Sequence, residues 1–461
     1  MSDIRLGFYP EDHAMAGKPL SYPGDGHLIL VAPTRSGKGR DILTPALLSA
    51  RRSCIIIDPK AQLAAITKRR RSQFGKVLVL NPFNILRERL GDQGGPQGGP
   101  ARFNPMDTLN PADDAFTADC DNLAEGIVSP DPGGKDDRHF TDSARQLVSG
   151  VIMHLVSDPA CPTEKKTLGF MREVVTRNIF RFAQIALESG TNAVKERLAR
   201  FADPKAYEGR EIPSILSVAN THSAFLGIEA IAQSVSGSDF QFRDLRSEEI
   251  TVYLTLPTRY LGAAGKWFRL VVASALNALL QEPKDGEDVP VLAVLDEFAQ
   301  LGELTIIKDA MALAAGYGLQ LFPVLQDLNQ LKTYGEHVWP TFLANSAVQM
   351  YFAPRENTTA DYLSKMSGEK EVSVPSESLG EASGPGKTGG PGKSGASVSW
   401  KHEVVPEQRL HDVLRLPNNE FFLFRQGQLV IRTRAPYFDE TRFPEFKGLY
   451  DPDPYYRPRK S

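Results

Sequence analysis

The stretch Ala32-Pro33-Thr34-Arg35-Ser36-Gly37-Lys38-Gly39 follows a short apolar run, His27–Val31, and precedes a helical pattern that reaches Leu48. A glycine-rich loop between a strand and a helix presents consecutive backbone N–H groups to phosphates, and its lysine reaches the β and γ oxygens. We therefore expect the loop to bind a nucleotide through six residues: Thr34, Arg35, Ser36, Gly37, Lys38 and Gly39.

Two positions of this loop depart from the general P-loop pattern. Ala32 stands where the first glycine is usual, which the backbone tolerates if φ at this residue is negative. Gly39 stands where a Ser or Thr hydroxyl usually meets Mg²⁺. The metal ion would then need a water molecule or another side chain at that position.

A second motif, Val291-Leu292-Ala293-Val294-Leu295-Asp296-Glu297, is an apolar strand with two carboxylates at its C-terminal end. In a Walker B arrangement, Asp296 holds Mg²⁺ through its water shell and Glu297 orients or deprotonates the attacking water. An Asp-Glu pair after a strand is weak alone, but parallel strands present their carboxyl ends at one edge of a sheet. We therefore expect both carboxylates to lie near Lys38.

Two further strand ends carry polar residues. Gln326 follows the apolar run 319–325, where its amide would face the γ-phosphate and position the lytic water; a strand-end cap is the alternative. Asp58-Pro59-Lys60 ends the run Cys54–Ile57 and either belongs to the nucleotide edge or forms a turn. The basic run Lys68 to Arg71 is typical of a solvated helix face, with a DNA or partner contact as the alternative.

Apolar runs of four to eight residues alternate with helical patterns at both ends of the chain. The runs are 27–31, 54–57, 77–80, 250–256, 289–295, 319–325 and 348–352, with shorter ones at 421–424 and 429–432. This alternation predicts an α/β fold with a mostly parallel sheet. Between them, the patterns at 141–156 and 192–202 have only helical spacing, which predicts an inserted all-α domain.

These patterns divide the chain into four parts. Residues 1–110 and 247–450 form the two portions of the nucleotide-binding domain, 111–246 the all-α domain, and 451–461 a polar, proline-rich tail. Residues 373–399 are mostly Ser, Gly, Pro and Lys without periodicity, and we expect a disordered or mobile loop there.

Composition excludes several classes of protein. A formal net charge of −3 argues against a uniformly basic nucleic-acid coat, although a local basic patch or lined channel stays possible. Three cysteines without CxxC spacing indicate neither a disulfide framework nor a zinc site, and fit a cytoplasmic protein. No signal peptide and no apolar stretch of ~20 residues is visible, and the longest, near 270–280, predicts a buried helix.

The order of several short motifs resembles that of type IV secretion coupling proteins, the conjugative DNA transfer ATPases of the TraG/VirD branch. The motifs are the P-loop, Asp58-Pro59-Lys60 with Leu63, Phe103-Asn104-Pro105, Asp296-Glu297-Phe298 with Leu301-Gly302, Gly316-Tyr317-Gly318, Gln326 with Gln330-Leu331, Tyr334-Gly335 and Asn345. The similarity runs from about Gly24 to Phe438. It implies a RecA-like P-loop NTPase domain that carries an all-α domain for substrate recognition.

The resemblance also implies a function. Such proteins assemble as hexamers, hydrolyse ATP with Mg²⁺ between subunits, and deliver relaxase-bound single-stranded DNA or protein effectors to the secretion channel at the cytoplasmic face of the inner membrane. It assigns nucleotide binding to Lys38 and its loop, Mg²⁺ to Asp296, and water activation and sensing to Glu297 and Gln326. Gly39 is a common variant in this branch.

Such assemblies also need an arginine finger and an attachment to the membrane. An arginine finger is expected if ATP sits between subunits, and Arg355, after the strand at 348–352, is a candidate by position; a surface arginine is the alternative. Family members normally carry transmembrane helices ahead of the P-loop domain, whereas here the domain starts almost at Met1. We expect either a short form without an anchor or anchoring through other secretion components.

Two other functions remain compatible with the sequence. One is a double-stranded DNA translocase of the FtsK/HerA type, against which the Asp296-Glu297-Phe298 and Gly316-Tyr317-Gly318 motifs speak. The other is an adaptor that uses nucleotide only to set its shape and captures substrate through the helical insert. Retention of both Lys38 and Glu297 favours hydrolysis, since an adaptor needs no water-activating carboxylate.

Overall fold

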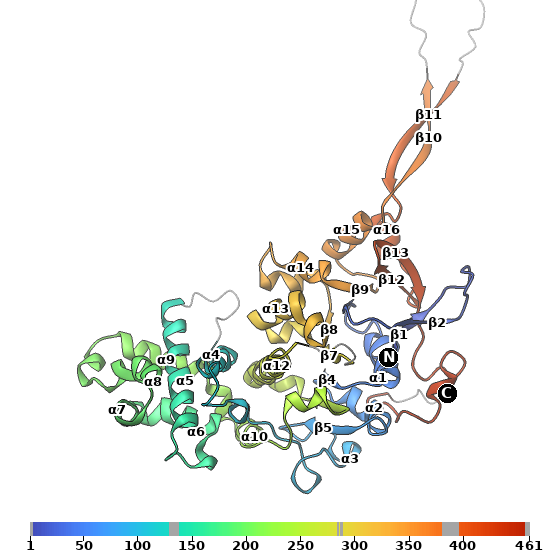
Figure 1. The fold of residues 1–461 in the computed structure, drawn as a ribbon. Coiled ribbons are helices and arrows are strands. Elements are labelled where there is room, and N and C mark those ends of the chain that lie inside the picture. The colour runs from blue at the N-terminus through green and yellow to red at the C-terminus, as the bar shows by residue number, and fades with distance from the viewer. Residues whose placement is uncertain (1–2, 129–137, 284, 286–288, 380–395, 457–461) are drawn as a thin grey trace, which may run out of the picture.

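The computed structural model describes residues 3–128, 138–283, 285, 289–379 and 396–456 of the 461-residue chain. An 11-stranded sheet forms the centre of the molecule, with a block of helices beside it and a two-stranded ribbon projecting from it (Figure 1).

The strand order in the large sheet is β2-β1-β13-β12-β9-β3-β8-β7-β4-β6-β5. The strands from β9 to β5 in that order are parallel. They are β3 (His27–Val31), β4 (Cys54–Ile57), β5 (Lys76–Leu80), β6 (Ile250–Leu254), β7 (Val291–Leu295), β8 (Leu319–Leu325) and β9 (Ser346–Tyr351). Each lies within two residues of a predicted run, and the α/β fold with a mostly parallel sheet is confirmed.

Four antiparallel strands extend the sheet beyond β9. β12 (Glu420–Arg425) and β13 (Gln428–Thr433) match predicted runs, whereas β1 (Ile4–Phe8) and β2 (Pro19–Tyr22) have no counterpart in the sequence analysis. β1 and β2 are short, and β1 pairs through Phe8 with Thr433 near the other end of the chain. The pairing of β1 with β13 is far from local in sequence, so no local pattern marks β1 as a member of this sheet.

Successive residues of the parallel strands alternate between two buried faces of the sheet. On one face, Leu28 and Leu30 pack with α1 (Thr44–Ser49) and α2 (Gln62–Arg71). On the other, Ile29 and Val31 share a core with three helices: α12 (Lys266–Leu279), α13 (Thr305–Leu313) and α14 (Trp339–Ala344). Burial on both sides is why these strands read as continuous apolar runs.

Helix α12 matches the buried helix predicted near 270–280, and most of its residues are inaccessible to solvent. Among the described residues, no helix has both the length and the apolar character needed to cross a membrane.

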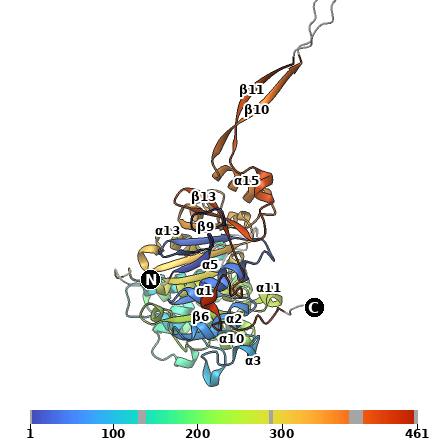
Figure 2. The ribbon, with the colours of Figure 1, turned by 90° about the vertical axis from the view of Figure 1, so that its right-hand side faces the viewer.

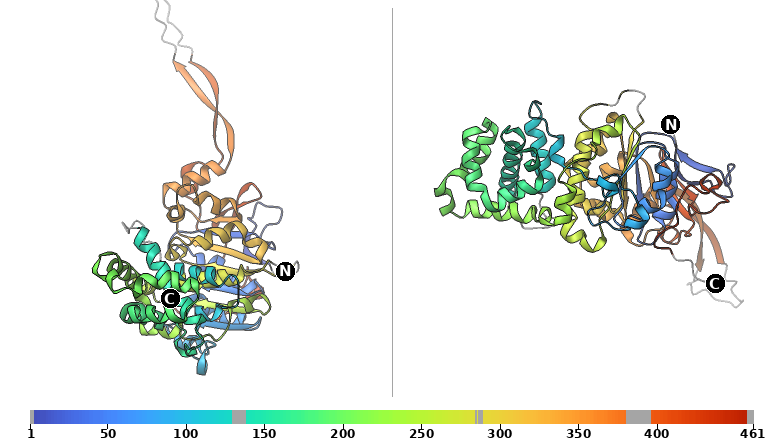
Figure 3. Two further views of the ribbon diagram at one scale, coloured as in Figure 1. Left: turned by 60° about the vertical axis from the view of Figure 1, so that its left-hand side comes forward. Right: turned by 90° about the horizontal axis from the view of Figure 1, so that it is seen from below.

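The helical block lies between β5 and β6 in sequence and contains no strand among its described residues. Its longer members are α4 (Phe116–Ile127), α5 (Arg138–Ser157), α7 (Ile179–Ser189) and α9 (Glu211–His222), with α6 (Leu168–Glu173), α8 (Asn192–Leu198) and α10 (Glu229–Ser234) between them. Figure 3 shows the block at one end of the molecule, with α12 between it and the sheet. Through α4 and α12 the two parts share one hydrophobic core.

The chain enters and leaves the helical block at adjacent points. The N–H of Phe103 donates to the carbonyl of Ser234 at 3.0 Å, and Arg102 forms an ion pair with Asp239 at 3.0 Å. The helical block is therefore an excursion from the α/β fold whose two ends meet.

The prediction of a disordered or mobile loop at 373–399 is wrong at both ends of this range. β10 (Glu369–Leu379) and β11 (Ala396–Pro406) pair antiparallel from Glu369↔Pro406 to Leu379↔Ala396, and the ribbon projects well beyond the sheet (Figure 2). Ser and Gly are the most frequent residues of this segment, but the hydrogen bonds of an antiparallel ladder join backbone groups and do not require apolar side chains. The remainder of the predicted loop, 380–395, lies outside the described residues.

The basic run at the end of α2 is only partly the solvated face that the sequence predicts, since Arg69 is exposed and Lys68 and Arg70 are half-buried. Arg71 is buried and donates to the carbonyls of Ala50 and Arg52 and, at 2.9 Å, to the hydroxyl of Thr251. Arg70 lies over the Phe74 ring, 4.4 Å from its centroid. Arg71 therefore ties the last turn of α2 to β6 and to the residues that precede β4, whereas the contact of Arg70 with Phe74 is local.

Candidate nucleotide-binding site

The predicted P-loop joins β3 to a short helical segment, η1 (Gly39–Leu43), and α1. Two of its residues have positive φ, Arg35 at 62° and Gly37 at 94°. A Cβ at Gly37 would lie 2.8 Å from the Asp41 carboxylate, so this position requires glycine. Ala32 is not among the residues with positive φ, which meets the condition set for an alanine at that position.

The sheet order places three functional strand ends side by side. β8 lies between β3 and β7, with Val31 opposite Leu325 and Pro323 opposite Leu295. Gln326, at the end of β8, therefore stands between the P-loop after β3 and the Asp-Glu pair after β7. The sequence alone placed these ends on one edge but did not order them.

The side chains that follow these strands form one continuous polar network. The Lys38 ammonium donates to Asp296 at 2.6 Å and to Glu297 at 3.5 Å. Gln326 donates through Nε2 to the other Glu297 oxygen at 3.3 Å and accepts at 3.1 Å from the hydroxyl of Thr34. The predicted catalytic and metal-binding residues are thus brought together.

The electrostatics of Lys38 follow from this network. Burial alone would lower its pKa, but the facing carboxylates of Asp296 and Glu297 outweigh burial and raise the pKa above the ordinary value. Lys38 therefore stays charged and can transfer its contacts to an anionic ligand. Glu297 adopts the left-handed conformation, with φ 59°, which is uncommon for a residue other than glycine and concentrates at functional sites.

The donor set fits a magnesium ion held together with a nucleotide. Among the described residues, no cluster of three or more His, Cys, Asp or Glu side chains forms a metal site. Mg²⁺ commonly takes one or two carboxylates and completes its shell with phosphate oxygens and water. Asp296 and Glu297 supply such carboxylates, and their side chains are 18% and 30% exposed. A Cβ at Gly39 would meet nothing within 4 Å, so water has room there.

A cavity of about 490 Å³ surrounds these residues. Its lining includes Arg35, Gly37, Lys38, Gly39, Arg40, Asp58, Pro59, Lys60, Gln62, Leu63, Thr258, Asp296, Glu297 and Tyr456. This volume lies in the range typical of small-molecule sites. The Asp58-Pro59-Lys60 segment thus borders the cavity.

The carboxylate of Asp58 itself has a structural partner. It accepts the N–H groups of Gln62 at 3.0 Å and Ala64 at 2.8 Å and so caps α2. Burial raises the pKa of Asp58 to about 7. The charge of Asp296 also raises this pKa, whereas the N–H donors lower it by less than burial raises it. The segment thus forms a turn, in which the N–H of Ala61 donates to the carbonyl of Asp58 at 2.9 Å, and this turn borders the cavity.

A buried arginine that supports the P-loop from behind was not predicted from the sequence. Arg434, just after β13, donates to Asp41 and, at 2.7 Å, to the carbonyl of Ser36, and its guanidinium lies 3.8 Å from the centroid of the Phe352 ring. Arg40 also donates to Asp41. Since Arg434 and Asp41 are 393 residues apart, only the antiparallel part of the sheet brings them together.

Arg355, the arginine-finger candidate, lies beside the loop of its own chain. Its guanidinium donates to the carbonyl of Thr34 at 3.4 Å, and the side chain is exposed. The candidate thus contacts the phosphate loop of its own chain but is not among the residues that line the cavity.

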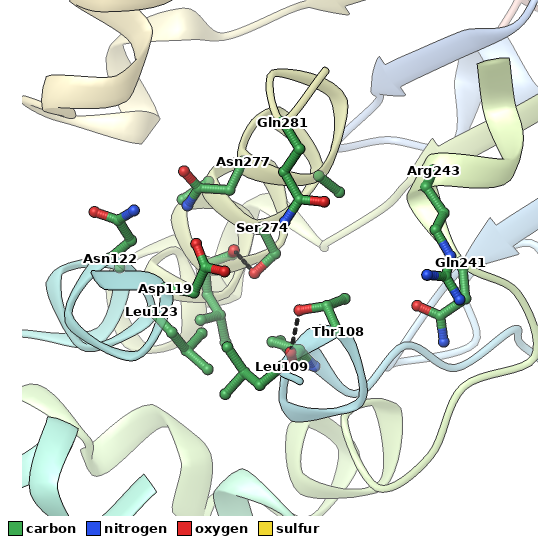
Figure 4. Close-up of a pocket in the computed structure, with 15 residues that line it drawn as sticks. Thr108, Leu109, Asp119, Asn122, Leu123, Gln241, Arg243, Ser274, Asn277 and Gln281 are labelled. Atoms are coloured by element: carbon green, nitrogen blue, oxygen red, sulfur yellow. Dashed lines mark hydrogen bonds between the residues drawn. The ribbon is translucent and has the colours of Figure 1, made fainter. Parts of the chain in front are cut away.

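A second, smaller cavity of about 50 Å³ lies between α4 and α12 (Figure 4). Asp119, Asn122, Ser274 and Asn277 contribute polar side chains to it, and it contains none of the predicted site residues. Its position marks the junction of the helical block with the α/β part.

A phosphate-binding loop, a strand-end Asp-Glu pair and a glutamine between them, all on one edge of a mostly parallel sheet, define a P-loop NTPase of the RecA-like fold. The family model described as "Type IV secretory system Conjugative DNA transfer" matches residues 8–450. The chain belongs to this family.

Individual relatives agree with that assignment. The chain is 30% identical over 376 residues to a conjugal transfer protein TraG of Escherichia coli, covering 77% of the chain and 56% of that protein. It is 30% identical over 378 residues to protein VirD4 of Rhizobium radiobacter, covering 80% and 52%. The chain thus spans about half the length of the curated relatives it matches. These matches favour the coupling-protein interpretation over the FtsK/HerA-type alternative.

Solved structures support the fold. The plasmid coupling protein TrwB in complex with ADP and Mg²⁺ superposes with a TM-score of 0.64 at 17% identity, over 89% of this chain and 84% of TrwB. The same protein with a non-hydrolysable ATP analogue has a TM-score of 0.61 at 16% identity, over 89% and 84%.

Proposed function

We propose that this chain is an ATPase that couples substrate delivery to a type IV secretion channel. The observation that carries the proposal is the network of Lys38, Asp296, Glu297 and Gln326, which joins three neighbouring strand ends inside one cavity. The family description and the nucleotide complexes of the structural neighbour TrwB support ATP with Mg²⁺ as the ligand.

Each residue has a distinct role in the proposed reaction. The N–H groups from Thr34 to Gly39 cradle the phosphates, and Lys38 neutralises the β and γ oxygens. Asp296 would hold Mg²⁺, which neutralises the charge that develops on the transferred phosphoryl group. Glu297 accepts the proton of the attacking water or orients it, and Gln326 holds the Glu297 carboxylate in place while its amide faces the γ position.

The proposed substrates follow from the family. We propose that the chain recruits relaxase-bound single-stranded DNA, protein effectors, or both, and acts at the cytoplasmic face of the bacterial inner membrane with other secretion components. Residues 111–246 would recognise the substrate, as the resemblance to the family implies; they form most of the block of helices beside the sheet (Figure 3). Assembly as a homo-hexamer would place each cavity at a subunit boundary.

The test is ATP hydrolysis by the purified chain with and without single-stranded DNA, beside Lys38→Ala and Glu297→Gln. We expect DNA to raise turnover, Lys38→Ala to lose nucleotide binding, and Glu297→Gln to bind ATP without hydrolysing it. Normal turnover in Lys38→Ala would refute the site. Turnover that persists in Glu297→Gln would refute the role of the carboxylate, and ATP binding without turnover in the wild type would favour the adaptor alternative.

A further inference from the structure

The segment at residues 450–456 lies along α2 and ends at the nucleotide cavity. The N–H of Asp451 donates to the carbonyl of Ile66 at 2.9 Å, and its carboxylate pairs with Arg69 at 3.0 Å. Gln62 donates to Asp453 at 2.7 Å. Contacts along most of the segment thus fix its course before it reaches the P-loop side of the molecule.

Two tyrosines end this segment, and they have different environments. Tyr455 donates its hydroxyl to the carbonyl of Lys60 at 2.8 Å, which fastens the segment beside the cavity. Tyr456 lines the cavity itself, and the residue is 63% exposed. Phe438 stacks loosely on Tyr456, with ring centroids 6.3 Å apart and planes at 27°, which backs one face of the tyrosine ring.

The position of Tyr456 matters because the cavity has two distinguishable ends. Lys38, Asp296 and Glu297 mark the end where the γ-phosphate would sit. The loop then continues through Gly39 into Arg40, so the α-phosphate and the nucleoside attached to it would emerge on the side of Arg40. Arg40 and Tyr456 line the same cavity.

We propose that the exposed face of Tyr456 is the stacking surface for the nucleobase, so that the segment at residues 450–456 completes the nucleotide site. This inference rests on the proposed function and adds the part of the site that holds the nucleoside. Stacking on an aromatic ring tolerates any base, because every base has a π face. Tyr456 therefore adds affinity for ATP and GTP alike and does not select between them.

The test compares ligands with and without a base on the full chain. Binding of a non-hydrolysable ATP analogue, its GTP counterpart and inorganic tripolyphosphate, each with Mg²⁺, is measured by calorimetry for the wild type, Tyr456→Ala and Tyr456→Phe. We expect Tyr456→Ala to weaken both nucleotides about fivefold or more and to leave tripolyphosphate unchanged. Tyr456→Phe keeps the ring and should bind as the wild type does.

Tyr455→Phe tests the attachment of the segment, since it removes the hydroxyl that fastens it; we expect it to weaken both nucleotides less than Tyr456→Ala does and to leave tripolyphosphate unchanged. Unchanged nucleotide affinity in Tyr456→Ala would overturn the inference. An equal loss for tripolyphosphate and nucleotides would also overturn it, because Tyr456 would then act through the phosphate loop. If the wild type binds neither nucleotide nor tripolyphosphate, the proposed function fails and this inference fails with it.

Discussion

Arg434 donates to the carboxylate of Asp41, and only 3% and 2% of these two side chains are exposed. The same guanidinium holds the carbonyl of Ser36, so the pair ties the antiparallel edge of the sheet to the phosphate loop. Removing one partner of a buried ion pair leaves an uncompensated charge, which typically costs ~3–5 kcal/mol of folding free energy.

We therefore predict that Arg434→Gln lowers the free energy of unfolding by ~3 kcal/mol, near the low end of that range because Arg40 still pairs with Asp41. The variant should also raise KM for ATP, since the loop loses the donor at Ser36. Urea denaturation and ATP titration measure the two effects. Arg432→Gln, on β13 two residues before Arg434, is the control, since its guanidinium lies over the Tyr9 ring. Wild-type stability and KM in Arg434→Gln would contradict the supporting role.

The amide of Gln326 bridges Thr34 and Glu297. We predict that Gln326→Leu, which keeps the volume and removes both hydrogen bonds, lowers kcat for ATP at least tenfold with little change in nucleotide affinity, because the carboxylate loses its orienting partner. Single-turnover hydrolysis and equilibrium binding separate the two effects. Asn329→Ala, a nearby exposed position, should behave as the wild type. A loss of affinity without a loss of kcat would make Gln326 a binding residue instead.

The buried parallel strands and the residues at their ends were predictable from the sequence because each signal is local. His27–Val31 is apolar throughout since both of its faces are covered, and Lys38, Asp296 and Gln326 each follow such a run. What could not be predicted depends on contacts between distant segments. Arg434 reaches Asp41 only through the pairing of β13 with its neighbours, and Tyr456 reaches the cavity only through contacts along α2.

The open space at Gly39 permits a test of metal binding. A Cβ there would meet nothing within 4 Å, so a serine hydroxyl fits without displacing the loop. We predict that Gly39→Ser lowers the Mg²⁺ concentration needed for half-maximal ATPase activity, because the hydroxyl supplies the oxygen ligand that P-loops usually provide. Gly37→Ser is the contrasting variant and should distort the loop, since a Cβ at this position would lie 2.8 Å from Asp41 and φ is 94°. An unchanged Mg²⁺ requirement in a well-folded Gly39→Ser would place the ion elsewhere.

The pKa of Asp58 predicts a specific dependence of stability on pH. Burial raises this pKa from 3.8 to about 7, so between these values the folded chain retains a proton that the unfolded chain has released. The contribution of Asp58 to stability is therefore fully present below pH ~4 and is lost as the pH rises to about 7. Asp58→Asn cannot titrate, and its melting temperature relative to the wild type should rise across this window. A constant difference between the two proteins would contradict the raised pKa.

The meeting of the two ends of the helical block makes its excision a feasible test of substrate recognition. Phe103 and Ser234 are joined by a hydrogen bond of 3.0 Å, and Asn104 donates to Ser238 at 3.0 Å. Replacing residues 106–233 by a short Gly-Ser linker should therefore leave the sheet and the nucleotide cavity intact. Deletion of residues 113–245 is less suitable than this replacement, because it removes the core residues Phe242 and Leu245.

We predict that the chain without residues 106–233 binds the ATP analogue with an affinity within a few-fold of that of the full chain. Relaxase-bound DNA should no longer raise its rate of ATP hydrolysis. Its melting temperature should fall, since α4 no longer covers the apolar face of α12 near Leu270 and Ala273. Calorimetry, thermal unfolding and DNA-dependent hydrolysis measure the three effects. Stimulation equal to that of the full chain would show that the substrate contacts lie on the α/β part, and loss of nucleotide binding in a folded product would show that the helical block supports the cavity.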